Sequence, residues 1–419
     1  MTVGIMGAAL VMTSAAEARK PPPVRCGDTI THNTKLKRSL AGCSGYGLIV
    51  KGRHITLDLN NLTVRGDNVA AEQVGILLDN ARDVTVKNGT VRGFDAGIDI
   101  EGGSNNTVKS IVARNNVNDN VAPADPKNPT PEEECNFGDG ITVTGSRGND
   151  IVRNHVLDNG PFSCISIVED SDGNTVAHNV VANNNVPNED AAPGIQGDGF
   201  CGSPFSRPVQ DIGIRVEGPG ANDNEVTDNK ITNSAIGGIT IHGYVFNPVM
   251  GPPQDPNTDN VVSKNYVADT GKETSTTDPV ADGISVLSQG PTSRVAVSQD
   301  NSIVGNTIVG SLRHGINLGG KPPQPVPPLD GNTVARNDVR TSAVNGINVA
   351  LGSINNTLNR NFAADSGGSD GFDANPGCDN NLWTDNEFDF VNMSCVEGPP
   401  AEVRPPAPAP ARSAPMPAR

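Results

Sequence analysis

The chain has 419 residues and a formal net charge of −16, with only 35% hydrophobic and 3% aromatic residues. Such acidity argues against nucleic acid or an anionic membrane as the main partner, because both repel it. A single compact globule of this length normally carries more large apolar side chains, while 47 Gly and 33 Pro indicate a chain that turns very often. These values favour an elongated, turn-rich repeat protein.

The first segment, residues 1–18, is predicted to be a signal peptide. Residues 3–12 are apolar, and Ala16-Glu17-Ala18 fits a small-x-small cleavage site. The apolar run is too short to cross a bilayer, and no later window approaches about 18 apolar residues, so no membrane span is predicted. We therefore expect a secreted, extracellular or periplasmic protein whose N-terminal cap covers residues 19–44.

Residues 45–396 contain an internal repeat. Its first element, Gly-(Ile/Leu)-x-apolar, starts at Gly47, Gly75, Gly97, Gly140, Gly213, Gly238, Gly283, Gly315 and Gly346, and once at Cys164. Its second element is Asn-x-apolar, usually twice in succession, as in Asn174-Thr175-Val176 and Asn179-Val180-Val181. Equivalent Asn residues recur about every 25 positions, as from Asn149 to Asn174, and the larger gaps indicate insertions.

The repeat predicts an all-β solenoid of about ten or more coils. Strands of three to five residues with alternating apolar positions bury one face and are too short to stand alone. Stacking the coils about 4.8 Å apart pairs the strands in parallel. Asn at the corners accepts left-handed backbone angles and can hydrogen-bond to the next coil.

The Gly-Ile-x-Val and Asn-x-Thr-Val series resembles the right-handed parallel β-helix superfamily, the broad pectate-lyase-like group that includes NosD-like periplasmic proteins. The resemblance covers about residues 45–392. Cys26-Gly27-Asp28-Thr29-Ile30, together with Cys43 and the segment 55–60, looks like the N-terminal cap of secreted members. This resemblance implies the fold and leaves the activity open, because one fold hosts many functions.

The seven cysteines predict disulfides at both ends of the folded body. None forms Cys-x-x-Cys, so a zinc ribbon or a thioredoxin-type site is not expected. In an oxidising compartment the local pairs Cys26–Cys43 and Cys378–Cys395 would protect the terminal coils. We also expect a Cys135–Cys201 pair, which leaves Cys164 as a small buried residue in a strand. Residues 397–419 are Pro/Ala-rich and are predicted to be a disordered tail.

Long insertions flank one strand ladder in the middle coils. Residues 118–138, 183–210 and 269–281 precede their Gly-Ile strands, whereas residues 244–258 and 319–331 follow theirs. Loops longer than about 12–15 residues are uncommon without a role. They are predicted to wall a groove above the ladder from Gly140 to Leu318.

The pleat places alternate residues of that ladder on the solvent side, where a site would lie. The candidate catalytic residues are Arg215, Glu217, His242, Asp139, Asp282 and His314, and the candidate substrate-binding residues are Thr142, Thr240, Ser285 and Asn317. Asp67, Asp79, Asp95 and Asp99 lie on early coils without long loops and are interpreted as solvated surface.

Two chemistries fit these candidates if the protein is an enzyme. A lyase or epimerase would use Arg215 to neutralise a uronate carboxylate and His242 as base or acid. A glycoside hydrolase would use paired carboxylates drawn from Asp139, Glu217 and Asp282. Structural alternatives stay open: Arg215 with Glu217 as a surface ion pair, His242 as a packing residue, and the two Asp-Gly pairs as corners that satisfy backbone donors.

The best-known catalytic signatures of the resembled group are absent, so no catalytic residue is transferred from it. Six His and six Met, scattered singly, also disfavour a NosD-like role in metal-centre maturation. No cofactor is predicted; Ca²⁺ stays open, with no motif in its support. The two functional hypotheses are a protein that acts on or binds polysaccharide and a non-catalytic extracellular structural or binding module. The sequence does not indicate an oligomeric state.

Overall fold

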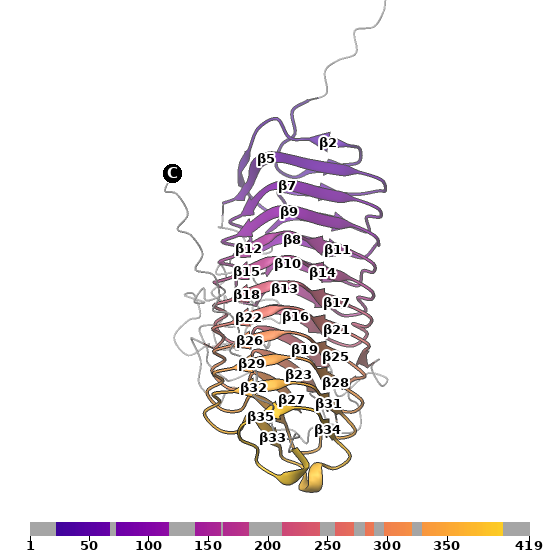
Figure 1. Cartoon of the computed structure of the whole chain (residues 1–419). Helices are drawn as coiled ribbons and strands as arrows, with labels where there is room; N and C mark the ends of the chain where they lie inside the picture. The colour runs from indigo at the N-terminus through magenta and orange to yellow at the C-terminus, as the bar shows by residue number, and fades with distance from the viewer. Residues whose placement is uncertain are drawn as a thin grey trace, which may run out of the picture.

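The computed structural model describes residues 22–67, 73–116, 139–160, 162–183, 212–243, 256–271, 281–288, 297–320 and 329–396. Within them the chain winds into coils stacked along one axis, from the indigo N-terminal end to the yellow C-terminal end (Figure 1). Each strand pairs in parallel with the equivalent strand of the next coil. The predicted parallel β-solenoid is confirmed.

Sheet A contains twelve strands, one from each successive coil. They are β1 (Asp28–Ile30), β4 (Leu48–Val50), β6 (Val74–Asp79), β8 (Ala96–Glu101), β10 (Asp139–Thr144), β13 (Ser163–Val168), β16 (Ile212–Glu217), β19 (Ile239–Gly243), β23 (Ile284–Ser288), β27 (Ile316–Gly320), β30 (Ile347–Val349) and β33 (Gly371–Asp373).

Sheet B covers the other side of the core. It begins with β2 (Thr34–Lys35), β3 (Leu40–Cys43) and three long strands, β5 (Thr56–Gly66), β7 (Thr85–Arg92) and β9 (Thr107–Arg114). Beyond β9 each coil contributes two short strands, so the sheet continues as two columns (Figure 1).

The first column contains β11 (Asp150–Val152), β14 (Thr175–Ala177), β17 (Glu225–Thr227), β21 (Val261–Ser263), β25 (Ser302–Val304), β28 (Thr333–Ala335), β31 (Thr357–Asn359) and β34 (Leu382–Thr384). The second contains β12 (His155–Leu157), β15 (Val180–Ala182), β18 (Lys230–Thr232), β22 (Tyr266–Ala268), β26 (Thr307–Val309), β29 (Asp338–Arg340), β32 (Phe362–Ala364) and β35 (Glu387–Phe388). A short pair, β20 (Asn257–Thr258) with β24 (Ser298–Gln299), and two 3-10 turns, η1 (Pro376–Cys378) and η2 (Ser394–Val396), complete the elements.

The narrow core explains why nearly every repeat begins with glycine. The Ile and Val that follow it, such as Ile141 and Val143, are fully buried in one continuous cluster. A Cβ atom on Gly140 would lie 2.3 Å from Val156 and 2.6 Å from the carbonyl oxygen of Cys164. This close approach, and not a left-handed backbone, is what requires glycine there.

Two internal ladders of Asn side chains join the coils at their corners. In one of these ladders Asn229 donates through Nδ2 to Asn265 Oδ1 and to the Val176 carbonyl. The Oδ1 atom of Asn229 accepts the backbone N–H and the Nδ2–H of Asn179. The hydrogen bonding between coils is thus as predicted. The left-handed angle falls on the residue before the ladder position, which is Asn in some coils, as expected (Asn105, Asn355), and Asp in others (Asp223, Asp228).

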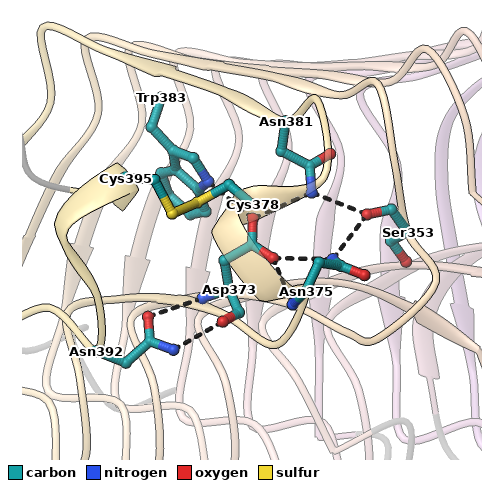
Figure 2. The surroundings of a disulfide bond; sticks show 8 residues. All are labelled: Ser353, Asp373, Asn375, Cys378, Asn381, Trp383, Asn392 and Cys395. Carbon is teal, nitrogen blue, oxygen red and sulfur yellow. Dashed lines mark hydrogen bonds between the residues drawn. A yellow bond between two sulfur atoms is a disulfide. The ribbon is translucent and has the colours of Figure 1, made fainter.

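Disulfides close both ends, as predicted. Cys26–Cys43 and Cys378–Cys395 have Cα–Cα distances of 5.3 and 6.1 Å. Figure 2 shows the C-terminal disulfide beside a buried carboxylate, Asp373, which accepts hydrogen bonds from Trp383 Nε1 at 3.0 Å, from Asn381 and from Asn375. This cap covers the last coil of the core.

Several sequence predictions concern segments beyond the described residues. They are the signal peptide 1–18, the tail 397–419, the Cys135–Cys201 pair and most of the long insertions. Cys164 is buried, as expected. In the part of the chain described here, no helix is long and apolar enough to cross a membrane.

Candidate functional site

The candidate residues follow adjacent strands of sheet A. Parallel register places Arg215 of β16 beside Thr240 of β19, and Glu217 beside His242. On the other side of β16, Arg215 lies beside Ser166 of β13, which in turn lies beside Thr142 of β10. These side chains alternate with core residues and therefore lie on the face of sheet A away from the core.

The expectation that this face is exposed to solvent is wrong for its central residues. Arg215 is 5% exposed, and Glu217 and His242 are each 2% exposed. They pack against one another at the spacing of neighbouring strands, and the Phe162 ring lies 4.1 Å from the guanidinium carbon of Arg215. The ion pair is therefore buried, in contrast to the surface pair that the sequence left open.

Glu217 is the centre of a buried triad. One carboxylate oxygen accepts a hydrogen bond from Arg215 Nη1, and the other lies 3.1 Å from His242 Nδ1. Burial alone would raise the pKa of Glu217, but the Arg215 charge and the His242 hydrogen bond outweigh it and lower the pKa to about 2. Glu217 is thus ionised and holds His242 through one ring nitrogen.

A second cluster centres on Asp139 and is joined to the triad. Asp139 accepts hydrogen bonds from Thr142 Oγ1 at 2.9 Å, Ser166 Oγ at 3.0 Å and the backbone N–H of Ser163 at 2.9 Å. Ser163 Oγ in turn accepts from Arg215 Nε at 3.1 Å. Burial raises the pKa of Asp139 to about 6, although these hydrogen bonds and the Arg215 charge oppose the rise.

Two of the early-coil aspartates, Asp95 and Asp99, differ from the solvated surface predicted for them, whereas Asp67 is exposed as predicted. Asp95 is buried and accepts the backbone N–H of Gln73 at 2.8 Å. Asp99 is half-buried, and burial together with the nearby Glu101 and Asp139 carboxylates raises its pKa well above the usual value. The register of the strands could have placed Asp99 beside the candidate residues, because Asp99 pairs with Thr142 on the next strand of the sheet.

Asp282 and His314 form a third group at the entrance of β23 and β27. Both Asp282 oxygens accept from Arg313, one at 2.7 Å, and Oδ1 also accepts the backbone N–H of His314 at 3.1 Å. Asn345 donates its backbone N–H to His314 Nδ1. Burial lowers the pKa of His314 to about 4, the nearby Asp282 opposing this and Arg313 adding to it, so the ring is neutral.

The remaining candidate binding residues hydrogen-bond along the sheet. Thr240 and Ser285 hydroxyls lie 3.2 Å apart, and Asn348 donates to Asn317 Oδ1 at 2.8 Å. Sequence reasoning missed Asn348, Ser163 and Arg313. Among the described residues, no group of three or more His, Cys, Asp or Glu side chains is placed to hold a metal ion.

The predicted groove depends mostly on loops that lie outside the described residues. The described part of the chain does contain a pocket of about 410 Å³, but it lies on sheet B. Its lining comes from β29, β32, β35 and their corners: Arg336, Asn337, Asp338, Arg360, Asn361, Phe362, Asp385 and Glu387.

Comparison with known proteins agrees with this architecture. The family model described as a right-handed beta helix region matches residues 26–251. The chain belongs to the right-handed β-helix family. No curated protein matches its sequence.

Comparison with solved structures finds several similar chains at low sequence identity. The Dettilon tailspike protein is 14% identical with a TM-score of 0.51, over 84% of this chain and 61% of the tailspike chain. A periplasmic alginate epimerase is 12% identical with a TM-score of 0.49, over 87% of this chain and 76% of its own. The DFA-IIIase from Arthrobacter chlorophenolicus A6 is 14% identical with a TM-score of 0.48, over 78% and 71%. Similarity at this identity shows the fold alone.

The β-helix thus joins two kinds of proton-transfer group on one face. The carboxyl group of Asp139 has a pKa of about 6, so it can donate a proton at mildly acidic pH. His242 is an imidazole whose Nδ1 is held by the ionised carboxylate of Glu217. Asp282 and His314 already use their acceptor atoms for Arg313 and for backbone N–H groups. The first two clusters therefore have the chemistry of a site, whereas the third resembles a strand corner.

Proposed function

We propose that this right-handed β-helix protein acts on a carbohydrate polymer along the outward face of sheet A between β10 and β19. The observation that supports this most is the position of Glu217, which binds Arg215 and His242 at once. A buried carboxylate on Nδ1 orients the imidazole, which is how a general base is held in many enzymes.

The reaction class that fits is abstraction of the proton next to a sugar carboxylate, as in a lyase or epimerase. His242 would be the base, and Asp139, linked through Ser163 and Arg215, the acid. Arg215 has a different role from the one its sequence position suggested. Its Nε and Nη1 donors are engaged by Ser163 and Glu217, so it positions Glu217 and is not assigned to the substrate carboxylate.

Glycoside hydrolysis by paired carboxylates has weaker support. That mechanism needs one carboxyl group as acid and a second as nucleophile or base. Glu217 and Asp282 are both bound to arginines, and the low pKa of Glu217 removes it as an acid. Only Asp139, with its pKa of about 6, fits the acid role.

We place the protein outside the cytosol, in the periplasm or the extracellular space. Two disulfides support this location, because such bonds persist in oxidising compartments and are rare in reducing ones. The polymeric carbohydrates that surround cells are available there.

The second candidate function is a non-catalytic binding or structural module. It is favoured by the near-complete burial of Arg215, Glu217 and His242, because a buried ion network can act purely as a fold-specifying contact. The two functions predict different results for one substitution at His242.

The test is turnover by the purified mature protein and by His242→Gln, with His178→Gln as the matched control on an exposed corner. Acidic and neutral polysaccharides are incubated with and without Ca²⁺, and ultraviolet absorbance of unsaturated uronate, reducing ends and epimer content by NMR are followed. Unsaturated product or epimerised sugar that disappears in His242→Gln alone, with unchanged thermal unfolding, supports the enzyme. A folded protein without turnover on any substrate supports the binding or structural module.

A further inference from the structure

Three arginines are stacked in register on the first coils of sheet B. Arg65 at the end of β5 pairs with Arg92 of β7, and Arg92 pairs with Arg114 of β9. Neighbouring strands are about 4.8 Å apart, so the three side chains form a row about 10 Å long, parallel to the solenoid axis. Figure 1 shows these three long strands lying side by side near the N-terminal end. We call this row the arginine ladder.

Other basic residues lie on the same strands as the arginine ladder. Lys87 of β7 pairs with Lys109 of β9. On its other side Lys87 pairs with Asp58 of β5. Residues 22–116 contain twelve Lys and Arg against nine Asp and Glu, in a chain whose net charge is −16. Positive charge is therefore concentrated at this end of an otherwise acidic molecule.

No acidic group compensates the ladder within the described residues. Arg65 and Arg114 are exposed and Arg92 is half-exposed, and none of the three guanidinium groups lies within ion-pair distance of a described carboxylate. Like charges directly opposite each other on neighbouring strands destabilise a sheet. The corresponding positions on later coils, Leu157 and Ala182, are uncharged, so the fold itself does not require arginine in this column.

We propose that the arginine ladder is a binding surface for an acidic polysaccharide whose chain lies along the solenoid axis. Guanidinium groups bind carboxylates and sulfates with two parallel hydrogen bonds, and a row at strand spacing presents them to successive charges of a linear polymer. The surface lies on sheet B and is separate from the candidate site on sheet A. It therefore does not depend on whether that site is catalytic.

The shape and charge of the surface favour this ligand over other polyanions. A membrane-binding patch usually clusters four to eight basic residues against a plane of lipid, whereas this row is one residue wide. Duplex nucleic acid carries a charge about every 1.7 Å of its axis and would be repelled by the acidic remainder of the molecule. A polyuronate is one chain wide and carries one carboxylate per sugar, so its charge density is lower than that of duplex nucleic acid and the acidic remainder repels it less.

The test is binding of polygalacturonate and alginate by the whole protein, with dextran as the neutral probe. The variant is the triple Arg65→Gln, Arg92→Gln and Arg114→Gln. Its matched control is Lys230→Gln, Lys264→Gln and Arg336→Gln, which removes the same charge from exposed positions that are not stacked on adjacent coils. Affinity is measured by calorimetry at two salt concentrations.

We expect the parent and the control to bind the acidic polymers in a salt-dependent manner and to ignore dextran. The ladder variant should lose at least about tenfold in affinity and keep or slightly raise its melting temperature, because repulsion between the guanidinium groups is removed. Both triple variants retain the candidate residues of sheet A, so a loss of affinity confined to the ladder variant reports on this surface. The proposal is overturned if the parent does not bind, if both triple variants weaken binding equally, or if anionic vesicles or duplex DNA bind as tightly.

Discussion

His242 Nδ1 lies 3.1 Å from Glu217 Oε1 across the adjacent strands β16 and β19. The same carboxylate also binds Arg215, so three ionisable side chains that are almost inaccessible to solvent form one unit. Each member depends on the others, because an isolated charge at this depth is strongly destabilising. This coupling leads to the first prediction.

Removing one member of the Arg215–Glu217 pair should destabilise the fold more than removing both. Glu217→Gln leaves a buried, uncompensated guanidinium, and Arg215→Gln leaves an uncompensated carboxylate, so each single change should cost about 3–5 kcal/mol of unfolding free energy. The double variant should cost less than either single change, because it leaves neither charge of the pair uncompensated. Urea unfolding of the four proteins measures this coupling, and additive effects would show that the pair contributes no specific interaction.

Asp139 gives a pH-dependent prediction. Burial raises its pKa from 3.8 to about 6 in the folded protein. Between these values the folded state binds more protons than the unfolded state, so stability contributed by this group falls as pH rises from about 4 to 6 and stays lower above. Asp139→Asn keeps an acceptor for Ser163 and removes the charge, so it should stabilise the protein by about 2–3 kcal/mol at neutral pH.

The measurement is urea unfolding of Asp139→Asn and the parent at neutral pH and below the unfolded-state pKa. At the lower pH the difference should vanish, because the parent carboxyl group is then protonated in both states. Asp150→Asn, on an exposed position of β11, is the control and should change little. A variant less stable than the parent at neutral pH, with no difference at the lower pH, would mean that the Asp139 charge is stabilising.

Much of the fold could be predicted because the coils repeat the same local sequence pattern. Gly140 is required by the 2.3 Å approach of Val156, and Ile141 and Val143 by the core, so a single coil shows the pattern of all. The backbone conformation at the corners was predicted less well. The sequence shows that Asn recurs, but in some coils the left-handed backbone angle belongs to a preceding Asp, such as Asp223 or Asp228, which no spacing rule distinguishes.

The candidate site could be predicted only as a set of neighbours. Alternation and coil order place Glu217 beside His242, since both follow from the period of a strand and the length of a coil. Burial does not follow from alternation, because an outward position can be covered by neighbouring side chains, as Phe162 covers Arg215. The arginine partner of Asp282 was missed, because Arg313 lies outside the strand pattern, at a corner before β27.

The Asn ladder predicts a large cost for removing one amide. Asn229→Ala would leave the Asn179 N–H groups, the Val176 carbonyl and Asn265 Oδ1 without their side-chain partner. Buried groups left unpaired cost about 1–3 kcal/mol each, so we expect a loss of at least about 3 kcal/mol. Lys230→Ala, the exposed neighbour on β18, is the control, and thermal and urea unfolding measure both. If Asn229→Ala lowers the free energy of unfolding no more than Lys230→Ala does, water replaces the amide.

The C-terminal cap can be followed by its own reporter. The chain has one tryptophan, Trp383, which is buried, donates to Asp373 and packs against Phe388 with ring centroids 5.9 Å apart. The Cys378–Cys395 bond closes a 17-residue separation, for which the loop-entropy estimate is about 3 kcal/mol. Because each coil contacts mainly its neighbours, loss of this bond should open the last coil before the rest.

Replacing Cys378 and Cys395 together by Ser should therefore shift Trp383 emission to longer wavelength at a temperature where the far-ultraviolet β signal is still intact. The matched variant replaces Cys26 and Cys43, at the opposite end, and should leave Trp383 emission unchanged until the whole solenoid unfolds. Emission and circular dichroism recorded along one thermal ramp separate the two events. If both signals change together in both variants, the solenoid unfolds as a single cooperative unit and the cap does not open independently.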